Sequence, residues 1–432
     1  MHHYTASHSN LSLSRAHSYQ SREFARRSTD DISLTRRSCG EISESKCAGK
    51  VFELTDEFTV ARCARRLQEV LRGLSVYLLG RKQTRFLNSN VKGHIQREIM
   101  APSVTRYAVP ASFFGIVLGI VGLGNVWRRA TQVWGAPHIV AESVMALGVV
   151  VWGILVGMFV WKWLFNRAQA IGEAQHPVQC CFIGLGGVST MLVAGAVLPY
   201  QHAVAEGLFW IGAIFTLGFG VWRSGLLWRG GREETTNTAV LYLPTVAGSF
   251  VGATTLAAFG YDPEWSQLAF GAGVLSWLAI ESVLLHRLLC APTLAAALRP
   301  TLGIQLAPPT VGAVSYLSIT SGAPDAAAHA MLGYGLLQAL ILLRNWNWFA
   351  EQSFVPGYWG FSFGLTALAL APLIMISRGD HGAIATLAPV LFFVGNLGIA
   401  CLTWGTIRLA FNGGLIAAIK VNPLHASEQK SA

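Results

Sequence analysis

The chain has 432 residues, of which 52% are hydrophobic and only 12% are charged, and its formal net charge is +10. Soluble domains carry about 25% charged residues, and here the charge is concentrated at one end: residues 1–100 hold 17 of the 32 basic and 10 of the 22 acidic residues. The remaining 332 residues carry 15 basic and 12 acidic side chains, too few to cover a soluble globular surface. The composition excludes a soluble enzyme over this part and predicts a membrane protein.

The first hundred residues form a separate polar and basic segment. Residues 1–100 are rich in serine, carry a net charge of +7 and mostly lack apolar periodicity, which is typical of disordered chain. Residues 59–82 are the exception, because apolar residues recur there at helical spacing with arginines opposite. This amphipathic helix is predicted either to bind an anionic membrane surface or to be a short solvated helix. Met100 begins a polar lead into the first apolar run and is an alternative start of the chain.

Ten apolar runs follow, each long enough to cross a bilayer core of about 30 Å as a helix. Short loops separate the runs, and most tryptophans lie near the run ends, as in the aromatic belts of membrane proteins. The predicted spans are 107–127, 138–164, 177–198, 203–227, 239–259, 266–289, 302–321, 327–348, 358–377 and 384–410. The expected fold class is an all-α polytopic membrane protein, with ten transmembrane helices as five helical hairpins in a domain of residues 101–420.

Basic residues predict the orientation in the membrane. The loops and flanks after even-numbered spans carry eight lysines and arginines, whereas those after odd-numbered spans carry three, Arg128, Arg129 and Arg378. Because basic loops stay on the cytoplasmic side, both termini are expected to be cytoplasmic, including residues 1–100 and the tail 421–432. The expected location is the cell inner, or plasma, membrane.

A proline repeat distinguishes the odd-numbered spans from the even-numbered ones. The first third of spans one, three, five and seven holds Pro110, Pro177, Pro244, and Pro308 or Pro309. The spacings, taken to Pro309, are 67, 67 and 65 residues, so the period is one hairpin and indicates an internal repeat. The ninth span carries GFSFG at 360–364 in place of a proline.

Small residues recur along one side of the same spans. The glycines concerned are Gly115, Gly119, Gly184, Gly187, Gly248, Gly252 and Gly312. One interpretation is close helix packing, as in GxxxG contacts. The other is that the odd-numbered helices surround a common axis and leave a permeation path, with prolines where the backbone faces the cavity.

The residues that bear chemistry do not form a catalytic centre. The seven cysteines contain no CxxC pair, and the histidines of the apolar part lie at span ends, in loops or in the tail. We therefore expect no metal, no cofactor, no enzymatic activity and no nucleic-acid partner. Glu281, in WLAIESVLLHR, is the one carboxylate deep in a span, where an acid is costly and needs a partner. It is expected either in a structural pair with an arginine or a hydroxyl group, or in a proton relay.

The odd-numbered spans also indicate the cargo. Their small-residue stripes contain no acidic residue, whereas a cation channel carries acidic rings, so we expect an anion or a neutral solute. Phe363 lies in the ninth span between Ser362 and Gly364. Its ring is expected either to pack in the core or against lipid, or to close a narrow pore by excluding water, with Gly364 giving it room to move.

Seven separated motifs resemble the tellurite-resistance/dicarboxylate transporter family, TehA type, to which the plant slow anion channels are related. They occur in order between about residues 105 and 412: ASFFGIVLGIVGLGNVWR, HPVQCCFIGL, LYLPTVAGSFVG, GVLSWLAIESVLLHRL, LGIQLAPP, GYGLLQ and WGFSFGLTALA. The resemblance implies five hairpins in a quasi-fivefold arrangement around a central pore, and a homotrimer in which each subunit has its own pore.

The resemblance also implies roles for individual residues and a class of cargo. Phe363 matches the family's pore gate, and the prolines match the residues that kink its inner helices. The cargo implied is a small anion, such as chloride, nitrate, tellurite or a C4-dicarboxylate, and the family is associated with tellurite resistance. The alternative hypothesis is a proton-coupled C4-dicarboxylate or tellurite carrier that uses Glu281.

Overall fold

The computed structural model of the chain describes residues 109–414, and within this range the regular structure is entirely helical. The all-α fold class is confirmed for these residues. The predicted N-terminal segment 1–100, its helix near 59–82, the alternative start at Met100 and the tail 421–432 lie outside the described residues.

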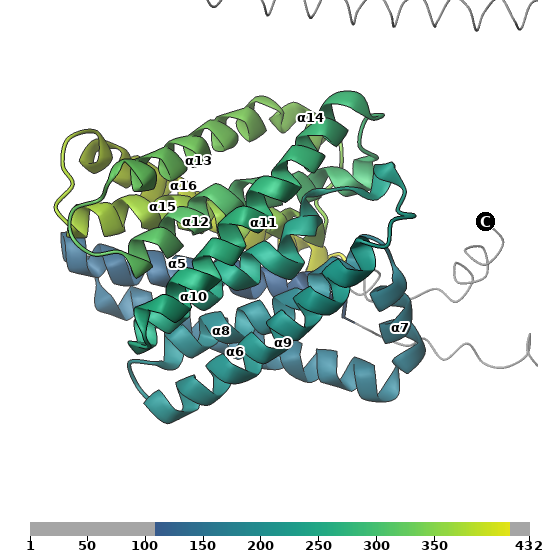
Figure 1. The fold of residues 1–432 in the computed structure, drawn as a ribbon, viewed down its shortest axis with the longest axis horizontal. Coiled ribbons are helices and arrows are strands. Elements are labelled where there is room, and N and C mark those ends of the chain that lie inside the picture. Colours follow the sequence, from purple (N-terminus) through teal and green to yellow (C-terminus); the bar gives the residue numbers. More distant parts are fainter. Residues whose placement is uncertain (1–108, 415–432) are drawn as a thin grey trace, which may run out of the picture. The chain divides into compact units, whose positions relative to one another are not determined.

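Long helices of 19–29 residues that are α-helical throughout alternate along the described chain (Figure 1) with helices that begin in a turn of another kind. The long helices are α6 (His138–Phe165), α9 (His202–Leu227), α11 (Pro263–Cys290), α13 (Ala326–Arg344) and α16 (Ala383–Phe411). Two further short helices, α7 (Arg167–Gln175) and α14 (Trp346–Ala350), and the 3-10 turn η3 (Glu234–Thr236) lie in connections.

The other main helices each begin with a turn that is not α-helical. These helices are α5 (Phe114–Trp134), α8 (Leu185–Val197), α10 (Gly248–Phe259), α12 (Ala307–Ile319) and α15 (Ser362–Ser377). The turns before them are η1 (Ala111–Phe113), η2 (Gln179–Gly184), η4 (Ala239–Tyr242) with the π-helical η5 (Leu243–Ala247), η6 (Ala296–Leu306) and η7 (Pro356–Phe361). Proline explains much of this, because it lacks the N–H donor that an α-helix interior requires.

Burial separates these two sets of helices. In the spans that contain α5, α8, α10 and α15, between 61% and 78% of the most apolar stretch is buried, and nine of the 13 residues of α12 are buried. In the spans formed by α6, α9, α11, α13 and α16 the buried share is only 17–28%. We call the first set the inner helices and the second the outer helices. The outer helices present apolar side chains such as Leu217 and Phe393 to the surroundings, as expected of helices that face lipid.

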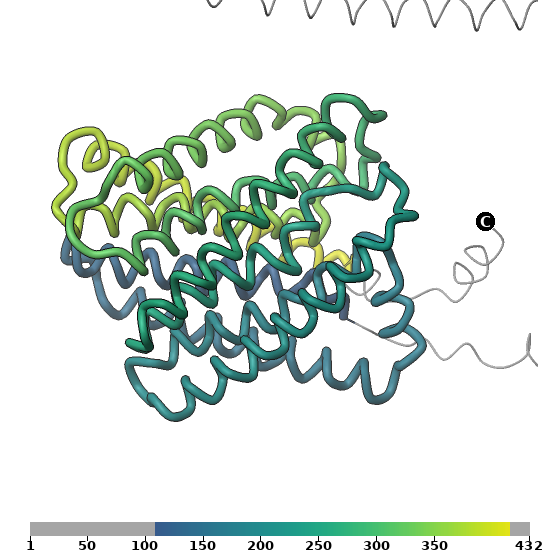
Figure 2. The backbone as a smooth tube through the Cα atoms, in the orientation of Figure 1, coloured from purple at the N-terminus to yellow at the C-terminus, as the bar shows by residue number. Residues whose placement is uncertain are grey.

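Contacts between helices follow the same division. Each inner helix contacts the outer helix that follows it in the chain, so that α5 pairs with α6, α8 with α9, α10 with α11, α12 with α13 and α15 with α16. The inner helices contact one another in a closed order, α5–α8–α10–α12–α15–α5. In Figure 2 the first inner helix, in blue, lies beside the yellow-green tube of α15, although the two are far apart in the sequence.

The ends of several helices show local sequence signals. Asp262 accepts a hydrogen bond from the Glu264 backbone N–H at 3.0 Å and caps α11, and Asp325 caps α13 in the same way. The helices α5 and α10 end at Gly135 and Gly260, whose φ angles of 69° and 72° are left-handed and favour glycine. These short turns return the chain directly into the next helix.

The expected spans agree with the structure at most positions. Within residues 109–414, nine helices are long and apolar enough to cross a bilayer. The expected span 302–321 differs, because η6 occupies its beginning and α12 contributes only 13 residues. Pro308 and Pro309 lie in the first turn of α12, where their missing N–H groups are tolerated, so the α-helix starts there and not earlier.

Candidate functional site

Two cavities are lined by residues of all five inner helices or of the turns that begin them. The first lies beside these turns and offers about 50 Å³ of space to water. Each inner segment contributes to its wall, and one example from each is Gly115, Leu185, Val246, Pro308 and Phe363. The wall is mostly apolar, and the small volume leaves room for only a few water molecules. We call this space the narrow cavity.

The second cavity lies toward the other ends of the inner helices and is ten times larger, at about 500 Å³. Its wall carries polar groups such as those of Asn125, Thr254 and Ser318. Three arginines line it, Arg128, Arg129 and Arg378, and within residues 109–414 no acidic residue does. We call this space the wide cavity.

Phe363 lies where the two cavities meet, since its side chain lines both of them. Val311 of α12 also lines both. A half-buried aromatic ring therefore stands, with a β-branched side chain, between a space of about 50 Å³ and one of about 500 Å³. An apolar constriction of this kind can block ions by excluding water from a short segment of the path.

The backbone on either side of Phe363 is held by neighbouring inner helices. The Ser362 hydroxyl donates to the backbone carbonyl of Gly115 on α5 at 3.1 Å. The Thr310 hydroxyl of α12 donates to the Gly364 carbonyl, also at 3.1 Å. Ser362 thus contacts one neighbour of α15 and Gly364 contacts the other, which leaves the residue between them directed at the two cavities.

The predicted glycines occupy several kinds of position. Gly115 lines the narrow cavity, as does Pro308. Four others lie so close to neighbouring segments that an added Cβ would be 2.1–2.8 Å from another atom: Gly119, Gly187, Gly248 and Gly364. A Cβ at Gly184 or Gly312 would lie 3.1–3.2 Å from an aromatic ring, whereas one at Gly252 would meet open space. Close helix packing therefore accounts for much of the small-residue pattern.

The predicted prolines lie at the beginnings of the inner segments. Pro110 precedes the first turn of η1, and Pro244 lies in η5. The Pro177 carbonyl accepts hydrogen bonds from Arg223 at 3.3 Å and Arg232 at 2.9 Å. Pro309 is buried in the first turn of α12. At Pro177, therefore, two arginine side chains satisfy a backbone carbonyl that no α-helical hydrogen bond uses.

The close packing of Gly187 leads to a stability prediction. A Cβ there would lie 2.1 Å from Thr216 Oγ1 and 2.7 Å from the backbone oxygen of Gly212. Gly187→Ala is therefore expected to destabilise the protein by about 1–3 kcal/mol through overpacking, as a lower midpoint of thermal unfolding in detergent. The control is Gly195→Ala on the same helix. No atom lies within 4 Å of a Cβ added at Gly195, and alanine forms helices better than glycine. Equal midpoints for the two variants would contradict the packing explanation.

Glu281 lies in a buried hydrogen-bond network that joins inner and outer helices. Its Oε2 accepts from the Tyr242 hydroxyl and, at 3.1 Å, from Trp277 Nε1. Its Oε1 accepts from Gln305 Nε2 at 3.0 Å and from the Tyr334 hydroxyl at 2.8 Å. The partners belong to η4, α11, η6 and α13, so the carboxylate has donors from hydroxyl groups, as one of the two sequence alternatives expects.

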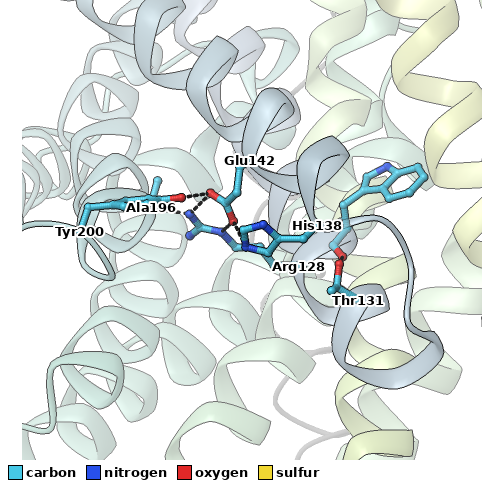
Figure 3. Close-up of polar contacts among 7 residues, drawn as sticks. Arg128, Thr131, His138, Glu142, Ala196 and Tyr200 are labelled. Atoms are coloured by element: carbon cyan, nitrogen blue, oxygen red, sulfur yellow. Dashed lines mark hydrogen bonds and ion pairs between the residues drawn. The ribbon is translucent and has the colours of Figure 1, made fainter.

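A second polar cluster links the ends of α5, α6 and α8 (Figure 3). Arg128 donates to both carboxylate oxygens of Glu142 at 2.8 and 2.7 Å, and its Nη2 also donates to the Ala196 carbonyl at 3.1 Å. His138 Nε2 lies 3.5 Å from the same carboxylate. The Tyr200 hydroxyl donates to Glu142, and this hydrogen bond raises the pKa of Tyr200. The cluster links three helices, and its Arg128 also lines the wide cavity.

In residues 109–414, no group of three or more histidine, cysteine, aspartate or glutamate side chains is arranged to hold a metal ion. Cys180 and Cys181 are buried, with their sulfur atoms 3.9 Å apart.

Pro356 and Trp359 are among the narrow-cavity residues that the sequence did not indicate as site residues. Pro356 begins η7 and lines the cavity, so the fifth inner segment also begins with a proline, just before the expected span 358–377. Trp359 lines the same cavity, and its Nε1 donates to Thr406 Oγ1 at 2.8 Å. The PGYWGF sequence carries the signal, but tryptophans near span ends are common at membrane interfaces and do not by themselves indicate a cavity.

Comparison with known proteins gives consistent matches. Residues 108–407 match the family described as voltage-dependent anion channel, SLAC1. The chain is 36% identical over 276 residues to a tellurite resistance protein TehA homolog of Haemophilus influenzae, which covers 63% of this chain and 84% of that protein. It is 24% identical over 334 residues to the guard cell S-type anion channel SLAC1 of Arabidopsis thaliana, covering 73% of this chain and 58% of that channel. The chain thus spans little more than half of the plant relative.

Proposed function

Because the chain belongs to the voltage-dependent anion channel family, SLAC1, we propose that it moves small anions across the membrane along the axis of its inner helices, with Phe363 as the gate. The family and the relatives support a multi-pass membrane anion channel or transporter of the SLAC1/TehA type, and the resemblance of the motifs to the TehA type is confirmed. The permeation path, the gate at Phe363 and the identity of the cargo are what we propose beyond this.

The observation that carries the proposal is that Phe363 lines both cavities. A path through the narrow and wide cavities would pass this ring. The lining residues of the two cavities include three arginines and no carboxylate, so electrostatics along this path favour anions over cations. The mostly apolar wall of the narrow cavity offers few binding groups, which suits fast passage more than tight binding.

The architecture we propose is ten membrane helices in five hairpins, with the odd-numbered helices in a quasi-fivefold inner ring. Its support is the closed order of contacts among α5, α8, α10, α12 and α15 and the pairing of each with the following outer helix. In this arrangement η6 and α12 together make the seventh crossing. The prolines and non-α turns then line or border the path near one membrane surface.

The proposed setting is the cell inner, or plasma, membrane, with both termini in the cytoplasm as the distribution of basic residues predicts. The exposed apolar surface of the outer helices is compatible with contact to lipid and to sister subunits of a homotrimer. The cargo is chloride, nitrate, tellurite or a dicarboxylate. Tellurite resistance, named for the Haemophilus influenzae relative, is a proposed consequence of such transport.

The hydrogen bonding of Glu281 bears on the alternative function, a proton-coupled dicarboxylate or tellurite carrier. Glu281 does not line either cavity, and all four of its partners donate to it. A relay carboxylate needs a route for its proton to the transport path, and Tyr242, which lines the narrow cavity, is the residue through which such a route would run. We favour a structural role, and the carrier hypothesis is tested below.

The experiment that tests the channel proposal is ion-replacement electrophysiology on the purified full chain in planar bilayers. Currents whose reversal potential follows the gradient of chloride or nitrate, and not that of the accompanying cation, would support it. Currents that follow the cation gradient, or uptake of anions into vesicles that requires a pH gradient, would contradict passive anion permeation.

A further inference from the structure

The arginines of the wide cavity differ in how their guanidinium groups are used. Arg128 is neutralised by Glu142 and bound to the Ala196 carbonyl at the end of α8. Arg378 donates to the carbonyls of Leu317 and Gly322, each at 2.8 Å, and so satisfies the end of α12. Both side chains therefore donate hydrogen bonds to carbonyls at helix C-termini, where carbonyls without a helical partner carry partial negative charge.

Arg129 is different, because its only hydrogen bond in the described part of the chain is a contact of 2.9 Å with the side chain of Gln132, one turn along the same helix. No carboxylate among residues 109–414 lies within ion-pair distance of it, although the side chain is half-buried and lines the wide cavity. A partly desolvated cation without a counter-charge is unfavourable. Binding of an anion in the cavity would offset that cost.

We propose that the wide cavity is an anion-binding vestibule in which Arg129 recruits small oxyanions, carboxylate or nitrate, before they pass Phe363. The inference rests on the proposed anion path. It adds to that path a binding site and a preference for oxyanions over chloride. The planar guanidinium offers paired N–H donors that match two oxygens of one oxyanion, whereas chloride takes only one point of contact. The Asn125 side-chain amide, which lines the same cavity, can supply a further donor, whereas the Thr254 and Ser318 hydroxyls donate to backbone carbonyls of their own helices.

The volume of the vestibule fits this class of ligand. A space of about 500 Å³ holds a small oxyanion with part of its water shell, since one water takes about 30 Å³ of liquid volume. The narrow cavity beyond Phe363, at about 50 Å³, has no such room. Anions are therefore expected to collect on the Arg129 side and to lose water as they approach the ring.

The test uses the full chain and two substitutions of Arg129. Arg129→Gln removes the charge, and Arg129→Lys keeps the charge but removes the paired donors. The matched control is Arg408→Gln on α16, an exposed arginine outside both cavities. Each protein is recorded in bilayers in sodium chloride and in sodium nitrate, at about 0.01 M and about 1 M, where the Debye lengths are about 30 Å and about 3 Å.

We expect Arg129→Gln to lower the anion conductance at low salt by about tenfold, the lower end of the effect of a cleft lined by charge of one sign. This loss of conductance is expected for anions that enter from the wide cavity. It is expected to shrink toward zero at about 1 M salt, where charges are screened. Arg129→Lys is expected to keep the conductance but to lose the preference for nitrate over chloride. An unchanged conductance of Arg129→Gln at low salt, or an equal loss in Arg408→Gln, would overturn the proposal.

A second readout separates this inference from the channel proposal. Nitrate added to purified protein in detergent is expected to raise the midpoint of thermal unfolding, since a ligand that binds the folded state stabilises it, and Arg129→Gln is expected to abolish the shift. Nitrate binding without anion current would reject the channel and keep the vestibule. Anion current without an Arg129-dependent shift or salt effect would keep the channel and reject the vestibule.

Discussion

Phe363→Ala is expected to raise the anion conductance of the protein by about tenfold, which corresponds to removal of a barrier of about 1.4 kcal/mol. The reason is that the ring lines both the narrow and the wide cavity, so its removal joins them and lets water enter the constriction. Single-channel or macroscopic recording in bilayers with symmetrical chloride measures the effect. Phe363→Leu retains an apolar but smaller side chain and is expected to give an intermediate conductance.

The matched control for the gate is Phe393→Ala. Phe393 is a phenylalanine on the outer helix α16 with 65% of its surface exposed, so its truncation removes a ring of the same size without touching the cavities. Its conductance is expected to equal that of the unmodified protein. If Phe363→Ala is well folded and conducts no better than Phe393→Ala, Phe363 is not the barrier on the path.

Glu281→Ala is expected to cause the largest loss of stability among the substitutions considered. It would leave the buried donors of Tyr242, Trp277 and Gln305 and the half-buried hydroxyl of Tyr334 without their shared acceptor. One unsatisfied buried group costs about 1–3 kcal/mol, and several donors lose their partner here. We expect a strongly lowered thermal midpoint in detergent or loss of folded protein. The control is Glu264→Ala in the first turn of the same helix, an exposed residue.

Glu281→Gln separates a structural role from a proton relay. Glutamine keeps one carbonyl acceptor in place of two carboxylate oxygens and is therefore expected to be more stable than alanine at this position. In vesicles, Glu281→Gln is expected to give the same anion flux as the unmodified protein. This is expected both with and without a pH gradient. A flux that depends on the pH gradient in the unmodified protein and loses this dependence in Glu281→Gln would instead establish the carrier hypothesis.

The positions of the helices could largely be predicted because hydropathy is a local property. A bilayer requires about 20 apolar residues per crossing helix, so runs such as 138–164 and 384–410 closely match α6 and α16. The start of the seventh helix could not be predicted from hydropathy, because the apolar run is continuous there. Pro308 and Pro309 decide where the α-helix begins. Hydropathy does not distinguish a 3-10 turn from an α-helical one.

The role of individual small residues could not be predicted from the stripe that they form. Gly115 lines a cavity, but Gly187 and Gly248 both lie against Thr216 of the outer helix α9. On the sequence Gly115 and Gly248 have the same spacing of four residues to a following glycine, Gly119 and Gly252, although their surroundings in the structure differ. Which side of an inner helix faces the axis depends on how that helix is rotated against its partners, and this rotation is set by contacts between distant segments.

By itself, the sequence determined the membrane class, the alternation of two kinds of helix and the importance of Phe363 as a candidate, because hydropathy, proline spacing and motif order are all written along one chain. Only the tertiary structure decided that Phe363 lines two cavities, that Glu281 has four donors and that Arg129 has no counter-charge within residues 109–414, where Arg128 has one. The physical reason is that each of these depends on side chains brought together from separate helices. Tyr334 and Glu281, for example, are 53 residues apart, and no periodicity within a single span encodes such a contact.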